Sequence, residues 1–239
     1  MKKLDKIQFS FLRMLLNAPK TTPIQSLLWE TGSLDMKSRI NERKLNMYHH
    51  IMNLEDEAVA KKVAESQIKN NFPGLMKECK TLLRIYDVED EPNKFTKFAW
   101  KRQVKEAVKK VAAENILNNM KKYKKVDYKK KCEETFQLKE YLRNMNLQRA
   151  RMKFSIETQM VKNFKFHFMS VDEYEKSNWC CDFCMNTFNV YMPDSLAHAL
   201  NCTKYSLLRD KFNLNDEIGV IDYYSEIVKR RNNLTSVLK

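Results

Sequence analysis

Apolar residues recur every three or four positions along most of the chain, which is the pattern of amphipathic helices. Helical segments are predicted over residues 4–17, 57–70, 73–86, 94–125, 128–144, 147–161 and 216–231. Two more are recognised by their ends: one begins at Thr22 and Pro23 and stops at Gly32, and the next is capped by Ser33. The pattern therefore predicts a mainly α fold, a multi-helix array.

The period changes around residues 163–169, where Phe164, Phe166 and Phe168 alternate with polar residues and favour a short strand. The acidic segment Asp87–Pro92 is the predicted connector between helical parts. On this basis we expect three regions. They are helices over residues 1–90, basic helices over residues 91–162, and a small Cys/His module with a C-terminal helix over residues 163–239.

The charge balance indicates a class of partner. The 239 residues include 44 Lys and Arg against 30 Asp and Glu, a formal net charge of +14. A surplus of this size favours a polyanion, RNA or DNA, as partner.

No run reaches about 18 uncharged residues, and no signal-peptide cleavage site follows the basic N-terminus. We therefore expect no membrane partner and an intracellular protein of the nucleus or cytoplasm.

Most of the surplus positive charge lies in residues 97–131, which hold 13 Lys and Arg but only three acidic residues. Lysines interleaved with an aromatic residue can follow a phosphate backbone while the ring stacks on a base. The alternative is a solvated helical face, the usual place for lysine. The candidate nucleic-acid-binding residues are Lys101, Arg102, Lys105, Lys109, Lys121, Lys122, Tyr123, Lys124 and Lys125.

Four of the six cysteines lie close together near the C-terminus, in the pattern Cys181-x2-Cys184-x13-His198-x3-Cys202. Two thiolates separated by two residues can bind one ion, and His198 and Cys202 lie one helical turn apart on one face. Three thiolates and an imidazole suit tetrahedral Zn2+, and a full set of protein ligands indicates a structural site. Cys180 could replace Cys181, but only Cys181 has the two-residue spacing to Cys184.

The spacing of this module is similar to that of a ββα finger, so Phe188 and Leu196 are predicted to form its small core. Asp194 or Ser195 is placed to cap the short helix that carries the histidine ligand.

Outside the module, Cys79 and Cys132 are predicted to be buried as small apolar side chains. His49 and His50 diverge by about 100° on a helix, so one should pack and the other face solvent. The three glycines are scattered, which excludes a glycine-rich phosphate loop, and we identify no catalytic residues.

Several segments, taken in order, resemble the region that follows the polymerase core in non-LTR retrotransposon reverse transcriptases. In that family a Pro-x-x-Thr-Pro and Glu-Thr-Gly stretch, a helix with an Arg-x-Leu element and a Cys-Cys-His-Cys module follow the polymerase domain. The matching segments here are residues 18–23, 27–32, 43–50, 163–165 and 181–202.

The resemblance implies that residues 1–90 are a thumb-side region, residues 91–162 a linker, and the zinc module a grip on template RNA or target DNA. The family's metal ligands carry over to Cys181, Cys184, His198 and Cys202. The family's Tyr-x-Asp-Asp polymerase motif is missing. The resemblance thus implies a C-terminal piece of an RNA-directed DNA polymerase without its catalytic residues, with the polymerase portion of a longer polyprotein as partner. The rival hypothesis is a zinc-stapled protein-interaction domain without nucleic-acid affinity.

Overall fold

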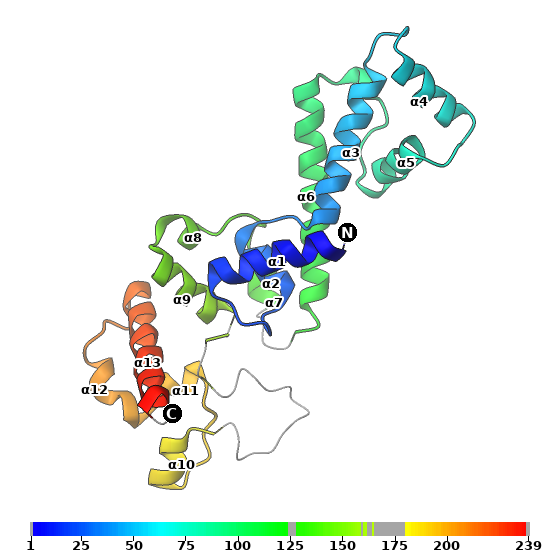
Figure 1. Ribbon diagram of the computed structural model, residues 1–239. Helices are drawn as coiled ribbons and strands as arrows, with labels where there is room; N and C mark the ends of the chain where they lie inside the picture. The colour runs from blue at the N-terminus through cyan, green and yellow to red at the C-terminus, as the bar shows by residue number, and fades with distance from the viewer. Residues whose placement is uncertain (1, 124–127, 159, 162–163, 165–179, 238–239) are drawn as a thin grey trace. The chain divides into compact units, whose positions relative to one another are not determined.

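The computed structural model describes residues 2–123, 128–158, 160–161, 164 and 180–237. Within these residues every regular element is a helix, apart from one isolated antiparallel β-bridge between Cys180 and Pro193. The predicted mainly α fold, with the Cys/His group near the C-terminus, is therefore confirmed. Two compact units are distinguished (Figure 1): unit 1 comprises residues 1–8, 32–122 and 128–137, and unit 2 comprises residues 9–31, 123–127 and 138–239.

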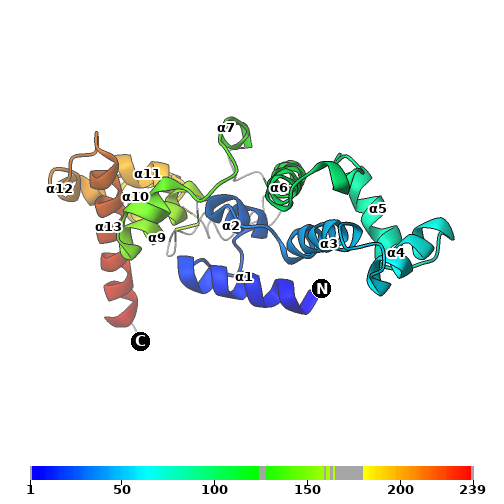
Figure 2. The same cartoon turned by 90° about the horizontal axis from the view of Figure 1, so that it is seen from above.

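Unit 1 is built around a long pair of helices. Its elements are α3 (Met36–Met52), α4 (Val59–Lys69), α5 (Leu75–Ile85), the 3-10 turn η1 (Pro92–Lys94), α6 (Lys97–Met120) and α7 (Tyr128–Glu133). Helix α3 packs along α6 and also contacts α4 and α5, as Figures 1 and 2 show. The acidic connector Asp87–Pro92 leads from α5 to α6 in this unit.

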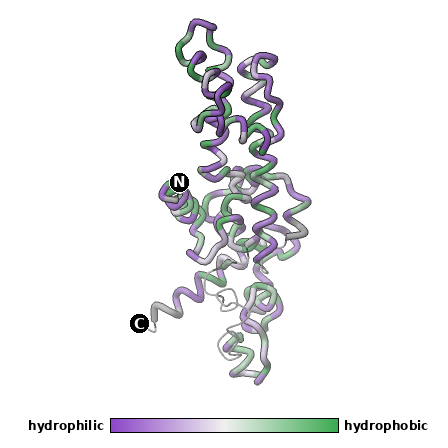
Figure 3. Tube along the Cα trace, turned by 90° about the vertical axis from the view of Figure 1, so that its right-hand side faces the viewer, coloured by the Kyte–Doolittle hydropathy of each residue, from purple (hydrophilic) through white to green (hydrophobic). Residues whose placement is uncertain are grey.

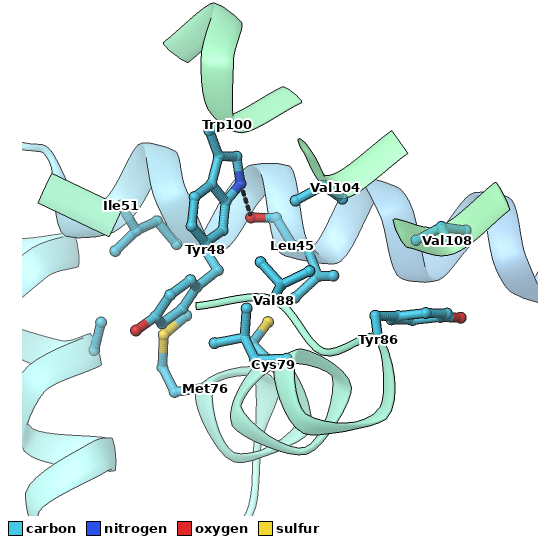
Figure 4. Packing of buried hydrophobic residues seen from close by; sticks show 12 residues of the cluster. Leu45, Tyr48, Ile51, Met76, Cys79, Tyr86, Val88, Trp100, Val104 and Val108 are labelled. Atoms are coloured by element: carbon cyan, nitrogen blue, oxygen red, sulfur yellow. Dashed lines mark hydrogen bonds between the residues drawn. The ribbon is translucent and has the colours of Figure 1, made fainter. Parts of the chain in front are cut away.

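The core of unit 1 explains why α6 lies on α3. The buried residues of α6 recur every four positions: Trp100, Val104, Val108, Ala112, Ile116 and Met120. Of these, Trp100, Val104 and Val108 belong to the buried cluster that α6 forms with α3. Trp100 is completely buried, and its indole Nε1 donates a 3.1 Å hydrogen bond to the carbonyl of Leu45 on α3 (Figure 4). The ring of His49 stacks on the same indole, with ring centroids 5.0 Å apart.

Unit 2 contains the helices α2 (Ile24–Thr31), α8 (Glu140–Asn144), α9 (Leu147–Glu157), α10 (Asp182–Phe188), α11 (Leu196–Asn201), α12 (Ser206–Arg209) and α13 (Glu217–Val237). The first helix, α1 (Lys2–Leu16), is divided between the two units. Helix α9 packs along α13, and the buried cluster of this unit includes Phe164, Tyr223, Tyr224 and Ile227. Hydrophilic and hydrophobic stretches alternate along the trace in Figure 3, as expected for helices that bury one face.

Local interactions correct some predicted boundaries. Asp35, not Ser33, caps α3, because its carboxylate accepts a 2.6 Å hydrogen bond from the Ser38 backbone N–H. Thr96 caps α6 in the same way, so the helix predicted over 94–125 begins at Lys97 and ends at Met120. The segment predicted as one helix over 128–144 is divided into α7 and α8.

Two predictions about single residues have different outcomes. His49 is buried and His50 exposed, as predicted. Cys79 is buried, but Cys132 is exposed, so its prediction as a core residue is wrong.

The strand expected around residues 163–169 lies outside the described residues except at Phe164, which is buried. Among the described helices, none combines the length and the apolar character that a transmembrane span requires.

Candidate metal centre and candidate nucleic-acid interface

The structure brings the four predicted metal ligands together. The thiols of Cys181, Cys184 and Cys202 and a ring nitrogen of His198 all lie within 4.8 Å of one another, and all four residues are buried. Cys180 is buried beside this group but does not belong to it. The predicted choice of Cys181 over Cys180 therefore agrees with the geometry.

Three short segments of backbone position the group. Cys181 is the N-cap of α10 and Cys184 lies in its first turn, so both thiols emerge at the same end of the helix. Asn189 ends α10 in the left-handed conformation and turns the chain back, so that the Cys181 N–H donates to the Met192 carbonyl at 2.8 Å. His198 then comes from the first turn of α11 and Cys202 from its C-terminal end.

The separations fit a tetrahedral metal centre. The Cys184 sulfur lies 3.6 Å from that of Cys202 and 3.4 Å from Nε2 of His198, and the sulfurs of Cys181 and Cys202 are 3.9 Å apart. A tetrahedron with metal–sulfur bonds of about 2.3 Å has edges of about 3.8 Å. The buried Cys/His group can therefore hold one metal ion with little rearrangement.

The protonation behaviour of the group is consistent with this. Burial, together with the hydrogen bond to the Cys202 thiol and the charge of Cys181, raises the pKa of Cys184 to about 12. Burial likewise raises the pKa of Cys202 and lowers that of His198. The raised pKa values mean that no positive charge in this pocket stabilises the thiolates, and a bound cation would supply that charge. The lowered pKa keeps the imidazole of His198 neutral, which is the form that binds a metal.

Tyrosine and arginine side chains hold the metal-ligand segments in place. Tyr223 and Tyr224 of α13 donate to the α11 carbonyls of Ala199 and Leu196, at 2.6 and 2.9 Å. Arg209 donates to the carbonyl of Cys202 at 2.7 Å. These supports lie on helices after the cluster, so no spacing within the Cys/His pattern identified them.

Arg231 of α13 contributes the strongest of these supports. Its guanidinium forms two 2.8 Å hydrogen bonds with the Asp194 carboxylate, and both side chains are largely buried. The same group lies 4.1 Å from the ring centroid of Phe164 and donates to the Tyr205 hydroxyl at 2.9 Å. Asp194 is thus occupied by an ion pair.

The helix cap is instead supplied by Ser195, whose hydroxyl accepts the His198 N–H at 3.1 Å. Of the two predicted core residues of the module, Leu196 packs against the buried cluster. Phe188 is 52% exposed, so its prediction as a core residue is wrong. The physical reason is that residues 182–188 form a helix whose buried side is occupied by Cys184, rather than the strands of a ββα finger.

The predicted basic residues of α6 face solvent. Lys101, Arg102, Lys105 and Lys109 are exposed, and within the described part of the chain none of them forms an ion pair. Lys121, Lys122 and Tyr123 follow the end of the helix and are exposed as well. Lys124 and Lys125 lie outside the described residues.

One exposed aromatic residue of α6 was not among the predicted site residues. Phe98 is 83% exposed and lies on the face opposite Trp100, at the start of the helix. A helical projection places it with Arg102, Lys105 and Lys109, because these positions follow it by 4, 7 and 11 residues. That projection was the sequence signal that could have identified it.

A groove of about 860 Å3 lies on unit 1 beside α3 and α5. Lys37, Lys44 and Lys77 line it, together with Asp35 and Glu78. The two carboxylates are engaged, since Asp35 caps α3 and Glu78 is paired with Lys44. The groove therefore offers lysines and amides but no free pair of acidic groups for acid–base chemistry.

Compared with protein-family models, curated proteins and solved structures, the chain matches none of them. The features of the chain that bear on function are the Cys/His group, the exposed cations of α6 and the sequence motifs described above.

Proposed function

We propose that the chain binds RNA or DNA through α6, as the C-terminal portion of a retrotransposon-type RNA-directed DNA polymerase that lacks the polymerase active site. The observation that carries the proposal is the row of exposed cations on α6, which have no ion-pair partner among the described residues. Such a row attracts phosphates through charge and counterion release. Several segments resemble, in the same order, the region that follows the polymerase core in reverse transcriptases, and this resemblance supports the retrotransposon origin that we propose for the chain.

Zinc is the metal that we propose for the Cys/His group. Three thiolates and one imidazole are ligands that zinc prefers, and the four together complete a tetrahedron. A filled set of protein ligands leaves no position for a reacting water, so the ion stabilises the fold and takes no part in chemistry. Catalysis is assigned to no residue of this chain.

Metal analysis of the full chain purified without chelator tests the zinc proposal. We expect about one zinc per chain, lost in Cys181→Ala and retained in the matched variant Cys180→Ala. Cys79→Ser is a second control, because that thiol lies in the core of unit 1. Less than about half an equivalent of zinc in the unmodified chain, with no change in folding on chelation, would overturn the proposal.

The salt dependence of binding tests the nucleic-acid proposal. In the test variant, Lys101, Arg102, Lys105 and Lys109 are replaced by Gln, and we expect the slope of log K against log salt to fall by about 0.7 for each lost contact to a single strand. In the control, four exposed cations outside α6 are replaced by Gln: Lys20, Lys69, Lys211 and Lys229. An equal effect of the two variants would show that net charge, not α6, is responsible.

A protein-interaction domain is the second candidate, and one observation favours it. The segment between the two ligand pairs exposes Phe188, Val190, Tyr191 and Met192, and residues 177–203 contain no Lys or Arg. An apolar surface without cations suits a protein partner better than phosphates. If the chain shows no affinity for RNA or DNA at about 50 mM salt, this candidate replaces the first.

A further inference from the structure

We propose that α6 binds single-stranded nucleic acid, with one unpaired base stacked on Phe98 and the neighbouring phosphates on Arg102, Lys105 and Lys109. This inference rests on the proposed nucleic-acid-binding function and specifies its ligand.

Phe98 lies in the first turn of α6 and is exposed to solvent. A single exposed apolar residue is ordinary on a protein surface. Phe98 is distinguished by its 83% exposure and by the neighbours on its own face of the helix. With 100° between successive residues, positions 98, 102, 105 and 109 fall within about 60° of one another. One helix face therefore carries an aromatic ring followed by three cations.

The ring and the three cations follow one another along the axis of α6. At 1.5 Å per residue, Phe98 and Arg102 are separated by about 6 Å along the axis, and the row to Lys109 extends about 16 Å. Glu106 is the first acidic residue of α6, and its exposed side chain lies to one side of this row. A ring and three cations spaced in this way suit one base and the backbone that continues from it.

Single and double strands present different surfaces to an exposed aromatic ring. The flat faces of bases in a duplex are already stacked, so an exposed phenyl ring finds no partner there. A single strand presents unstacked bases, and stacking on aromatic side chains is the usual way in which proteins hold them. Because Phe98 has no hydrogen-bonding group, it cannot distinguish base edges, and we expect binding that tolerates many sequences.

The dipole of α6 also favours a negatively charged ligand at the N-terminal end of the helix. Lys97 occupies the first turn of α6, which contains no acidic residue, and Lys101 and Arg102 follow in the next turn. Positive side chains at a helix N-terminus are disfavoured by the dipole, whose positive end lies there. This end of α6 therefore carries three positive side chains beside the exposed ring, together with the positive end of the helix dipole.

The experiment is fluorescence anisotropy with the full, zinc-loaded chain and a labelled oligonucleotide of about 20 bases, single-stranded or as a duplex of equal length. We expect preference for the single strand. Phe98→Ala should weaken single-strand binding by about 5- to 150-fold, the effect of one lost base–aromatic stack. Phe98→Tyr should retain the affinity, and Phe72→Ala, which removes a 54% exposed Phe of the same unit, should change nothing.

The slope of log K against log salt distinguishes the contribution of Phe98 from that of the three cations. Phe98→Ala removes no phosphate contact, so its slope should equal that of the unmodified chain. Replacing Arg102, Lys105 and Lys109 together by Gln should lower the slope by about 2. This pairing of affinity loss without slope change is a result that a general folding defect does not produce.

The outcomes distinguish the inference from the proposed function. If the chain binds nucleic acid but Phe98→Ala binds as tightly, or if the duplex is preferred, the stacking inference is overturned and the proposed function stands. If the chain binds neither form at about 50 mM salt, both fail. Binding to vesicles of anionic lipid without binding to either oligonucleotide would also overturn the inference, in favour of a membrane surface.

Discussion

Asp194 and Arg231 form a buried ion pair that joins the segment before α11 to α13. The carboxylate is 6% exposed and the guanidinium 15%. Burial lowers the pKa of Arg231, but its hydrogen bonds and charge interaction with Asp194 outweigh this, and the pKa is raised overall. The guanidinium therefore stays charged in the interior, beside the Asp194 carboxylate.

We expect Asp194→Ala to lower the free energy of unfolding by about 3 kcal/mol, because it removes a carboxylate that forms two hydrogen bonds with a buried guanidinium. Urea unfolding measures the effect. Asp222→Ala is a matched control: it breaks the ion pair with Arg149, which also has two hydrogen bonds but is 39% and 32% exposed. Its cost should be below about 1 kcal/mol. Equal costs for the two variants would contradict the assigned role of burial.

The cysteines outside the metal group differ in reactivity. Burial raises the pKa of Cys79 to about 11, whereas Cys132 is exposed. The reactive form is the thiolate, and a raised pKa means that little thiolate exists at pH 8. We expect iodoacetamide to modify Cys132 of the folded, zinc-loaded chain at pH 8 and to leave Cys79 unmodified, as read by peptide mass spectrometry. Rapid modification of Cys79 without denaturant would contradict its place in the core.

At the scale of an element, α6 has one buried face and one exposed face. Trp100, Val104 and Val108 pack in one buried cluster with residues of α3, and the face with Phe98 meets solvent. Burial explains the first face and does not explain the second. Stability and binding should therefore respond to different positions of the same helix.

We expect Trp100→Ala to lower the free energy of unfolding by about 3–5 kcal/mol, because it leaves a cavity in the core and removes the hydrogen bond to the Leu45 carbonyl. Phe98→Ala, two residues away, should change it by less than about 0.5 kcal/mol, since the ring is exposed. Chemical unfolding followed by circular dichroism compares them. A large loss in Phe98→Ala would mean that the ring supports the fold.

At the scale of the whole molecule, the two buried clusters share no residue. The cluster of unit 1 is formed by side chains between Leu45 and Val108, and that of unit 2 includes Cys181, Cys184 and Cys202. Metal binding contributes directly to the stability of the segment that supplies the ligands. The two clusters should therefore respond differently to chelation.

We expect a zinc chelator to increase amide hydrogen exchange in residues 181–227, while α3, α5 and α6 keep their protection. Hydrogen-exchange mass spectrometry of the full chain measures both regions at once. In a Cys202→Ala variant, the chelator should have no further effect. Loss of protection in both units together would show that the chain folds as a single cooperative body.

Sequence pattern was sufficient wherever neighbours in the chain determine the outcome. The spacing of Cys181, Cys184, His198 and Cys202 predicted a group that the structure brings together, because two short helices and the turn between them fix those distances locally. The alternation of buried and exposed positions placed the helices for the same reason. The contrast between His49 and His50 followed from the angle between adjacent helical residues.

Packing between distant segments decided the rest. The partner of Asp194 is 37 residues away, the exposure of Cys132 depends on what covers α7, and Phe188 was left outside the core once Cys184 occupied the inner side of α10. A sequence shows which side chains can be buried or charged. Only the tertiary structure determines which of them find partners, because burial and pairing depend on neighbours that are remote along the chain.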